Sequence, residues 1–398
     1  MNTTTETTGL PTFPRELGTW DRGRPGPTLC VLAGIHGNEP AGVLAVQRVL
    51  GQLQELDLAI DGRVVALCGN VQALGQGVRF LQRDLNRGWL PENLARLQRP
   101  SPAGEVGEDV EQRELLAAFD KAVATAQGPV VFVDLHSSSA DGPPFLCLAD
   151  TIDNRRVALS TGIPLILGIE ETIDGASLEW WSQRGIVNFA VEGGRHEHPD
   201  TVANHEAVLW VLLERLGMLQ PGQLPAGQVD LARHRAHVER VTRDQPAVVE
   251  IVERHAIQPV DAFRMKPGFR NFDRVDRGQV LATDARGEVR APFAGRVMLP
   301  LYQAQGDDGF FLARDVRPFW LGLAALLRRM RLDAVVHWLP GIRRDPQDPN
   351  TILVNRRVAR WFVTEVFHLL GFRRQRARGA VMAFTRRWSR PENKGLLG

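Results

Sequence analysis

The stretch TLCVLAGIHGNEPAGVLAVQRVLGQLQEL, residues 28–56, passes from an apolar run through a polar turn into a helical pattern. Residues 28–35 are predicted to form a buried strand, and residues 41–56 place apolar side chains at helical spacing. The turn between them holds His36 and Glu39, three positions apart. The stretch therefore predicts one unit of an α/β fold, whose turn is either a pair of metal ligands or an ordinary polar loop.

The same alternation of strand and helix continues through roughly the first 220 residues. Further buried strands are predicted at 63–70, 130–137, 144–150 and 185–194, and further helices at 107–126 and 201–219. This order favours a largely parallel sheet with helices on both faces, which binds ligands beyond the carboxyl ends of its strands. His36, His136 and Glu192 each fall at the end of a predicted strand, so we expect them at one edge.

Composition divides the chain into three predicted regions. A Pro/Gly-rich segment at 220–228 indicates a boundary, which places an α/β domain at 1–222. Short strand-like runs between turn residues predict a small β-barrel-like domain at 223–313. Residues 314–398 are predicted to be a basic helical extension, because they hold 17 Arg and one Lys against six acidic residues.

The cysteines and the N-terminal segment indicate in which cellular compartment the protein is expected. Cys30, Cys68 and Cys147 are few, odd in number and widely spaced, which fits a reducing compartment without a disulfide framework. The N-terminal segment has neither the basic nor the apolar part of a secretory signal, and no run of about 18 apolar residues predicts a membrane span. We therefore expect a cytoplasmic globular protein.

The histidines and glutamate at the predicted sheet edge suit a metal. A catalytic zinc ion usually takes three protein ligands and keeps one position for water. His36, Glu39 and His136 could supply those ligands, although any single histidine at a strand end is often a hydrogen-bonded structural residue. Two imidazoles and a carboxylate favour zinc, with another divalent metal left open.

The segment GVRFLQRDLNRGW, residues 77–89, supplies a group of arginines, with Asn86 beside Arg87. A guanidinium group matches a carboxylate in two-point contact and can also polarise a scissile carbonyl. The alternative is a solvated basic loop. Asp84 is a possible brace for one of these arginines.

Four motifs occur together in an order similar to that of a known family. They are GIHGNE at 34–39, RFLQRDLNR at 79–87, DLHSS at 134–138 and VEGG at 191–194. The chain thereby resembles the succinylglutamate desuccinylase/aspartoacylase family of the zinc carboxypeptidase superfamily, over about residues 28–313. The resemblance implies a zinc-carboxypeptidase-like mixed, largely parallel sheet flanked by helices, followed by the small β module.

The resemblance also implies roles for individual residues. It implies one Zn²⁺ per chain, held by His36, Glu39 and His136. It implies that Glu192 is the general base and acid, and that Arg79 polarises the scissile carbonyl. Asp134, two positions before His136, is expected on the opposite face of its strand and is not predicted as a ligand.

Substrate contacts are expected from further residues. The resemblance implies that Asn86 and Arg87 hold a substrate carboxylate. Aspartoacylases clamp a second substrate carboxylate with Arg and Tyr shortly before the catalytic Glu; here Arg184 is near that place but out of register. We also expect His196 to contact substrate, because it follows the catalytic motif.

Two aromatic departures argue against N-acetylaspartate as the substrate. Trp180 and Trp181 suggest a more apolar or aromatic subsite than the family has. Phe310 or Phe311 stands where the family places an active-site tyrosine. The acyl group and the amine half of the substrate are therefore left open.

The leading hypothesis is a zinc-dependent hydrolase that cleaves the amide bond of an N-acyl amino acid or a similar small carboxylate-bearing amide. A zinc carboxypeptidase or peptide amidase is the close alternative, and a homo-oligomer is possible. A hypothesis of another class makes the Arg-rich extension a binding module for nucleic acid or an anionic membrane. Its alternative is a solvated basic face on a helical appendage that packs on the catalytic domain or on another subunit.

Overall fold

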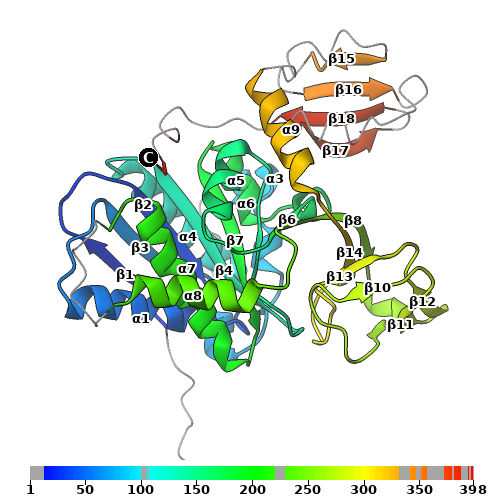
Figure 1. The fold of residues 1–398 in the computed structure, drawn as a ribbon, viewed down its shortest axis with the longest axis horizontal. Coiled ribbons are helices and arrows are strands. Elements are labelled where there is room, and N and C mark those ends of the chain that lie inside the picture. Colours follow the sequence, from blue (N-terminus) through cyan, green and yellow to red (C-terminus); the bar gives the residue numbers. More distant parts are fainter. Residues whose placement is uncertain are drawn as a thin grey trace, which may run out of the picture.

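The computed structural model describes residues 13–99, 105, 107–219, 229–330, 341–346, 351–355, 372–378, 381–386, 393 and 396–397. Figure 1 shows an α/β body whose sheet continues into a group of short strands, with a separate small sheet beside helix α9. The predicted fold class, a largely parallel sheet with helices and additional small sheets, is confirmed.

The central sheet places the predicted strands next to one another. Within the described residues it has the order β1-β3-β2-β4-β7-β5-β6-β8-β14-β13-β10. Its parallel core consists of β3 (Arg63–Cys68), β2 (Thr28–Ala33), β4 (Val130–Ser138) and β7 (Val187–Arg195). These strands are almost wholly buried because helices cover both faces, which explains their continuous apolar runs. Edge strand β1 (Glu16–Asp21) is antiparallel to β3, and β5 (Phe145–Cys147) is antiparallel to β7.

Two apolar cores lie on the two faces of this sheet. One face is covered by α1 (Ala41–Glu55), α5 (Ile152–Leu159), α7 (Pro199–Arg215) and α8 (Leu231–Thr242). The other is covered by α4 (Glu108–Ala124) and α6 (Ser177–Gln183). Short helices α2 (Val71–Gln76) and α3 (Pro91–Leu97) and the 3-10 turn η1 (Leu85–Arg87) carry the connection between β3 and α4.

The region predicted as a separate β domain shares its sheet with the first domain. Strand β8 (Val248–Ala256) pairs in parallel with β6 (Leu165–Leu167). Beyond it the sheet continues through β14 (Asp308–Asp315), β13 (Gly295–Met298) and β10 (Arg274–Val275). Strands β9 (Arg264–Met265), β11 (Val280–Asp284) and β12 (Gly287–Arg290) form a second, three-stranded sheet.

This continuity corrects the predicted division between residues 222 and 223. Helix α8, inside the region predicted to be all β, packs against α7 of the α/β body (Figure 1). The pairing of β8 with β6 then carries the first sheet into the second region. The predicted linker at 220–228 lies outside the described residues.

The basic extension is not only helical, which corrects a second prediction. Helix α9 (Pro318–Arg329) is present, but β15 (Ile342–Arg344), β16 (Thr351–Asn355), β18 (Val381–Arg386) and β17 (Phe372–Arg378) form an antiparallel sheet in that order. The run TILVN at 351–355 is rich in β-branched residues, which favour a pleated strand over a helix. Residues 355–372, which belong to the extension predicted to be helical, fall almost entirely outside the described residues.

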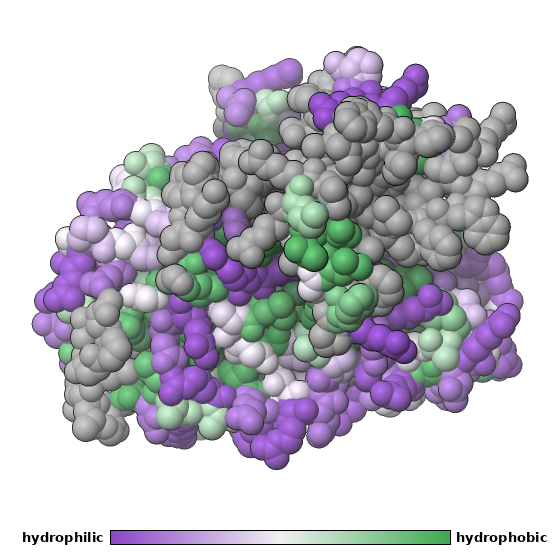
Figure 2. All heavy atoms as spheres, turned by 45° about the horizontal axis from the view of Figure 1, so that its top comes forward, coloured by the Kyte–Doolittle hydropathy of each residue, from purple (hydrophilic) through white to green (hydrophobic). Residues whose placement is uncertain are grey.

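The exposed face of the molecule is mixed in polarity. Figure 2 shows hydrophilic side chains around its periphery and hydrophobic ones nearer its middle. Phe319, Leu326 and Met330, in and just after α9, are among the large apolar side chains exposed to solvent. None of the described helices combines the length and the apolar character that crossing a bilayer requires.

The two tryptophans predicted to line an aromatic subsite belong instead to the core between the sheet and α4. Trp181 is fully buried and stacks on Phe132 of β4 with ring centroids 4.6 Å apart. Trp180 packs against Trp89 at 5.3 Å. The expectation was wrong because a large aromatic side chain on a short helix fills a core as readily as a pocket.

Replacing Trp181 with alanine should therefore act on stability. We expect Trp181→Ala to lower the free energy of unfolding by about 3–5 kcal/mol, the usual cost of a large cavity in a packed core. Leu326→Ala, at an exposed position of α9, should change it by less than about 0.5 kcal/mol. Denaturant titration of the two variants would test this, and equal stabilities would contradict the core assignment.

Candidate metal and catalytic site

The turn after β2 is held tightly against helix α2. Gly34 adopts a left-handed φ of 70°, which turns the chain out of the strand. A Cβ on Gly37 would lie 2.1 Å from the carbonyl carbon of Ala73, so α2 leaves room only for glycine there. The backbone N–H of Glu39 donates to the carbonyl of His36 at 3.2 Å. This close fit fixes His36 and Glu39 on one side of the turn.

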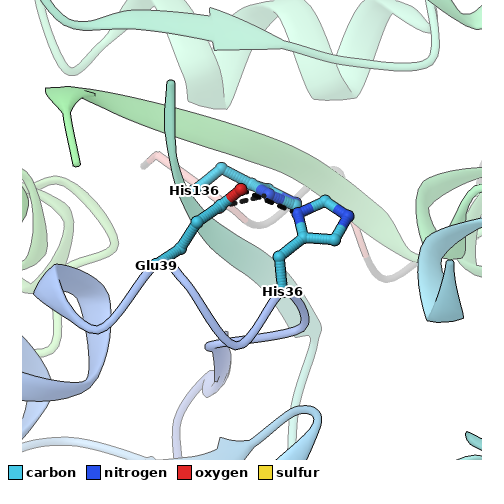
Figure 3. A group of neighbouring side chains, drawn as sticks. All are labelled: His36, Glu39 and His136. Carbon is cyan, nitrogen blue, oxygen red and sulfur yellow. Dashed lines mark hydrogen bonds and ion pairs between the residues drawn. The ribbon is translucent and has the colours of Figure 1, made fainter. Parts of the chain in front are cut away.

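The structure brings His36, Glu39 and His136 together, as Figure 3 shows. One ligand atom from each lies within 4.8 Å of the others, and all three residues are buried. The carboxylate of Glu39 contacts Nδ1 of His36 at 2.8 Å and Nδ1 of His136 at 3.1 Å. The backbone N–H of Ser137 also donates to Glu39, at 3.0 Å. Both imidazoles therefore present the same ring nitrogen to a shared carboxylate.

The other ring nitrogen of each histidine faces a second carboxylate. Nε2 of His36 lies 3.1 Å from Asp84, and Nε2 of His136 lies 3.2 Å from Asp134. Asp134 was expected on the opposite face of β4, which was wrong, because residues two apart in a strand point to the same face. The hydroxyl of Ser177 donates to Asp134 at 3.0 Å and holds that carboxylate in place.

These contacts fit a metal ion bound by three donors, which are the Nδ1 atoms of His36 and His136 and the carboxylate of Glu39. Histidines that bind metals usually donate their other ring N–H to a carboxylate, which fixes the tautomer. Burial would raise the pKa of Glu39, but His36 and His136 outweigh it and hold that pKa well below its ordinary range. The group is therefore an ionised, buried carboxylate between two imidazoles, a donor set that suits zinc.

Glu192 lies directly across from His136 in the adjacent strand. The two residues are partners in the parallel register of β4 and β7. Burial raises the pKa of Glu192 to about 7, and Glu39 adds to that rise, against His136, His36 and Arg79. Its Oε2 is buried and has no hydrogen-bond partner among the described residues. A carboxyl group in this condition can exchange a proton near neutral pH.

The loop from Arg79 to Arg87 places three side chains predicted to contact substrate, those of Arg79, Asn86 and Arg87, beside the candidate metal ligands. Arg79 donates to Asp84 at 3.1 Å and to Glu39 at 3.4 Å, so Asp84 does brace an arginine. The side-chain oxygen of Asn86 accepts from the backbone N–H of Ser177 at 2.9 Å. Arg87 donates to Asp308 of β14 at 3.3 Å.

A pocket unites these side chains. It is lined by residues that include the three candidate ligands, Glu192 and the arginine loop, together with apolar and acidic side chains: His36, Glu39, Arg79, Asn86, Arg87, His136, Ser137, Ser138, Ser139, Cys147, Ile169, Glu170, Ile173, Ala176, Leu178, Glu179, Ala190, Glu192, Leu299, Leu301, Gln303, Gly306, Asp307, Asp308 and Phe311. Residues from Leu299 onward come from the β13–β14 hairpin and its strand. Both predicted domains therefore contribute to one pocket.

Phe311 rather than Phe310 faces this pocket. Phe310 stacks on His255 at 4.8 Å, inside the small apolar core of the β region. Neighbouring residues of a strand point to opposite faces, so only one of the pair can reach the pocket.

Two predicted substrate contacts lie elsewhere. Arg184 stacks over Trp180, with Cζ 3.6 Å from the ring centroid, and donates to Asp120 of α4 at 3.3 Å. It sits at the end of α6, outside the pocket, which corrects its assignment. His196 lies behind the pocket wall, where its ring nitrogens contact Ser137 at 2.8 Å and Gln303 at 3.0 Å. Its influence on a ligand would pass through those two residues.

The part of the chain that carries the three candidate metal ligands matches a known family of catalytic domains in sequence. Residues 25–164 match the model of the Succinylglutamate desuccinylase/Aspartoacylase catalytic domain. A succinylglutamate desuccinylase of Burkholderia cenocepacia is 26% identical over 216 residues, 54% of this chain and 55% of the relative. One from Pseudomonas paraeruginosa is 40% identical over 62 residues, 16% of this chain and 19% of the relative. The matched part of the chain thus spans about half the length of the first relative and about a fifth of the second.

Solved structures share the fold over a larger part of the chain. The succinylglutamate desuccinylase of Chromobacterium violaceum is 18% identical with a TM-score of 0.52, covering 74% of this chain and 86% of the other. A succinylglutamate desuccinylase/aspartoacylase from Rhodobacter sphaeroides is 17% identical with a TM-score of 0.53, covering 75% and 87%. At these sequence identities, the similarity to the solved structures shows a shared fold and nothing beyond it.

The contact between Asp134 and His136 leads to a prediction about metal affinity. Asp134→Asn keeps the shape of the side chain but removes the charge that supports the imidazole, so zinc affinity should fall by about 10–100-fold. Competition with a chromophoric chelator would measure it, with Asp120→Asn, on the outer surface of α4, as the matched control. Unchanged affinity in Asp134→Asn would contradict this supporting role.

The raised pKa of Glu192 leads to a prediction about stability without metal. A group whose pKa is raised in the folded state stabilises that state at low pH, and the contribution is lost as pH rises through the folded pKa. For Glu192 the loss should run from its ordinary pKa of 4.5 to about 7. The Tm of Glu192→Gln minus that of the metal-free wild type should grow over this window and then level off. A difference that does not vary with pH would refute it.

Proposed function

Residues 25–164 belong to the succinylglutamate desuccinylase/aspartoacylase catalytic-domain family, and from that premise we propose that this chain is a zinc-dependent hydrolase of small N-acyl amides. The family predicted from four motifs is thereby confirmed. The proposal includes N-acyl amino acids and similar compounds as substrates. The observation that carries it is Glu192 placed opposite His136, beside the His36 and Glu39 pair.

The proposed metal ligands are His36, Glu39 and His136. A zinc ion bound there would lower the pKa of a water molecule toward 7 and polarise an amide carbonyl. Asp134 would keep the imidazole of His136 in the tautomer that leaves Nδ1 free to bind. Nε2 of His36 lies between the carboxylate of Asp84 and the guanidinium group of Arg79.

Glu192 is the proposed general base and acid. Its buried, unpartnered Oε2 has room for a hydrogen bond from a water molecule in the pocket. A pKa near 7 lets the carboxylate accept the water proton and then deliver it to the leaving amine. Arg79, whose guanidinium is fixed by Asp84, is positioned to donate to the oxyanion that develops on the scissile carbonyl.

The β13–β14 side of the pocket favours small substrates over polypeptides. Leu299, Leu301 and Gln303 line the pocket opposite the sheet edge, and Gln303 accepts from Asn38 of the ligand turn at 2.9 Å. This contact draws the β region across the site. The carboxypeptidase alternative needs an open groove along which a peptide can extend, and is for that reason less favoured.

The test is release of amine from a panel of N-acetyl and N-succinyl compounds with acidic, neutral and basic amine halves. We expect turnover by the zinc-loaded protein and its loss in chelator. Glu192→Gln should lower kcat by about 10²–10⁴-fold, because it removes the proton acceptor while keeping shape. Glu253→Gln, at an exposed position of β8, should leave kcat unchanged.

Three outcomes would each reject a part of the proposal. Turnover that survives in Glu192→Gln would exclude the assigned base, and turnover that survives chelation would exclude the metal. If wild type turns over none of the panel although zinc is confirmed bound, small N-acyl amides are excluded, and peptides become the next substrates to assay.

A further inference from the structure

Glu108, the first residue of α4, is a buried carboxylate that binds the backbone of the arginine loop, residues 79–87. Its Oε1 accepts a hydrogen bond from the backbone N–H of Leu81 at 2.6 Å, and its Oε2 accepts from those of Gln82 at 3.1 Å and Arg83 at 3.3 Å. Oε1 also accepts from the side chain of Asn70 at 3.1 Å. Successive N–H groups that bind one anion require a defined backbone conformation, so this carboxylate fixes the middle of the loop.

The charge of Glu108 is compensated by these N–H groups rather than by a cation. Within the part of the chain that the structure describes, no lysine or arginine forms an ion pair with it, and the nearby guanidinium group of Arg83 pairs with Asp109 at 2.5 Å. Burial raises the pKa of Glu108, but the bonds from Leu81, Asn70 and other N–H donors outweigh it and lower that pKa below its ordinary value. The carboxylate is therefore ionised and engaged with the loop.

The segment that Glu108 holds lies between two side chains of the candidate site. Arg79 precedes it and is the proposed donor to the oxyanion, and Asp84 follows it and lies 3.1 Å from Nε2 of His36. Arg79 donates to Asp84 at 3.1 Å, so the two ends of the segment are joined across it. The carbonyl of Arg79 also accepts from the backbone N–H of Gly37 in the ligand turn, at 3.0 Å. A change in the shape of the segment would thus move both Arg79 and Asp84 relative to His36.

We propose that Glu108 is a positioning residue of the candidate site, which keeps Arg79 directed at the scissile carbonyl and Asp84 against His36. The inference rests on the proposed function, since that function assigns the task of Arg79. Glu108 is absent from the described residues that line the pocket, so it acts through the loop and not on a substrate.

Glu111, one turn later in α4, provides a matched control. It is also buried, and its carboxylate accepts from the backbone N–H groups of Val71 at 3.1 Å and Gln72 at 3.0 Å and pairs with Arg15. It therefore holds the start of α2, whereas Glu108 holds the arginine loop. A purely structural role for Glu108 predicts that Glu108→Gln and Glu111→Gln lower stability and leave the site in a similar way. A positioning role predicts that only Glu108→Gln alters the site.

Zinc affinity tests the hold on Asp84 without any substrate. Glu108→Gln keeps the shape of the side chain but replaces one acceptor oxygen with an N–H donor that faces the backbone N–H groups of the loop. We expect the Kd for zinc, measured by chelator competition, to rise by about tenfold, because Asp84 loses its fixed place beside His36. Glu111→Gln should leave it unchanged. An equal Kd in Glu108→Gln and wild type, or an equal rise in both variants, would overturn the inference.

Kinetics at saturating zinc test the hold on Arg79. Glu108→Gln should lower kcat by about 10–100-fold, since a small misplacement of a catalytic group has an effect of this size. KM should change little, because Asn86 is held separately by the backbone of Ser177 and Arg87 by Asp308. Glu111→Gln should change neither constant. A rise in KM with kcat unchanged in Glu108→Gln would contradict the assigned role.

A double-mutant cycle shows whether Glu108 acts through Arg79. In the background of Arg79→Ala, Glu108→Gln should lower kcat by less than about twofold more, because the group that it positions is already absent. Losses that multiply would overturn the inference. If Glu108→Gln does not fold, Glu108→Asp is measured instead. It retains the charge but is one methylene shorter, so every effect is expected in the same direction and with smaller size.

The two readouts separate this inference from the proposed function. A weaker zinc affinity in Glu108→Gln alone, in a protein that hydrolyses none of the N-acyl compounds, would support the positioning role and reject the hydrolase. Hydrolysis by wild type, with zinc affinity and kcat unchanged in Glu108→Gln, would do the reverse.

Discussion

The carboxylate of Glu39 is the interaction on which the rest of the site depends. It accepts from the backbone of Ser137 and contacts the Nδ1 atoms of His36 and His136, so it connects the turn after β2 to strand β4. A buried carboxylate is tolerated only where such partners compensate its lost hydration. The same contacts that compensate the buried carboxylate also collect three donor groups around one point.

The parallel register of the sheet places the reactive group beside these donors. Since β2, β4 and β7 are adjacent, the residues near their carboxyl ends share one edge, and Glu192 is paired with His136 directly before the register shifts between His136 and Ser138. The β13–β14 hairpin then closes that edge from the other end of the same sheet. An extended sheet can in this way supply both the floor and a wall of its own pocket, which keeps them in fixed relation.

The parts of this arrangement that sequence could predict are local. Buried strands gave apolar runs, and His36, Glu39, His136 and Glu192 stood out because each followed such a run. The pairing of β8 with β6 joins segments far apart in the chain and leaves no local signal. The contact between Arg87 and Asp308, which are 221 residues apart, could not be predicted from the sequence for the same reason.

Asp134 could have been found, since strand periodicity alone puts it beside His136. Arg184 and the two tryptophans were misassigned because proximity in sequence to Glu192 does not determine which side of α6 a residue occupies.

The last described residues of the chain return to the α/β body after the C-terminal sheet. Leu396 is buried in the same apolar core as α7, and the side chain of Asn393 donates to the carbonyl of Gly185, just before β7. The sheet β15–β18 is therefore anchored at both ends, by α9 on one side and by this return on the other. In architectural terms it behaves as an inserted module whose flanks belong to the host domain. Deleting everything after β14 would therefore remove Leu396 from the apolar core of the α/β body along with the basic sheet, so the sheet is better excised between its two anchors.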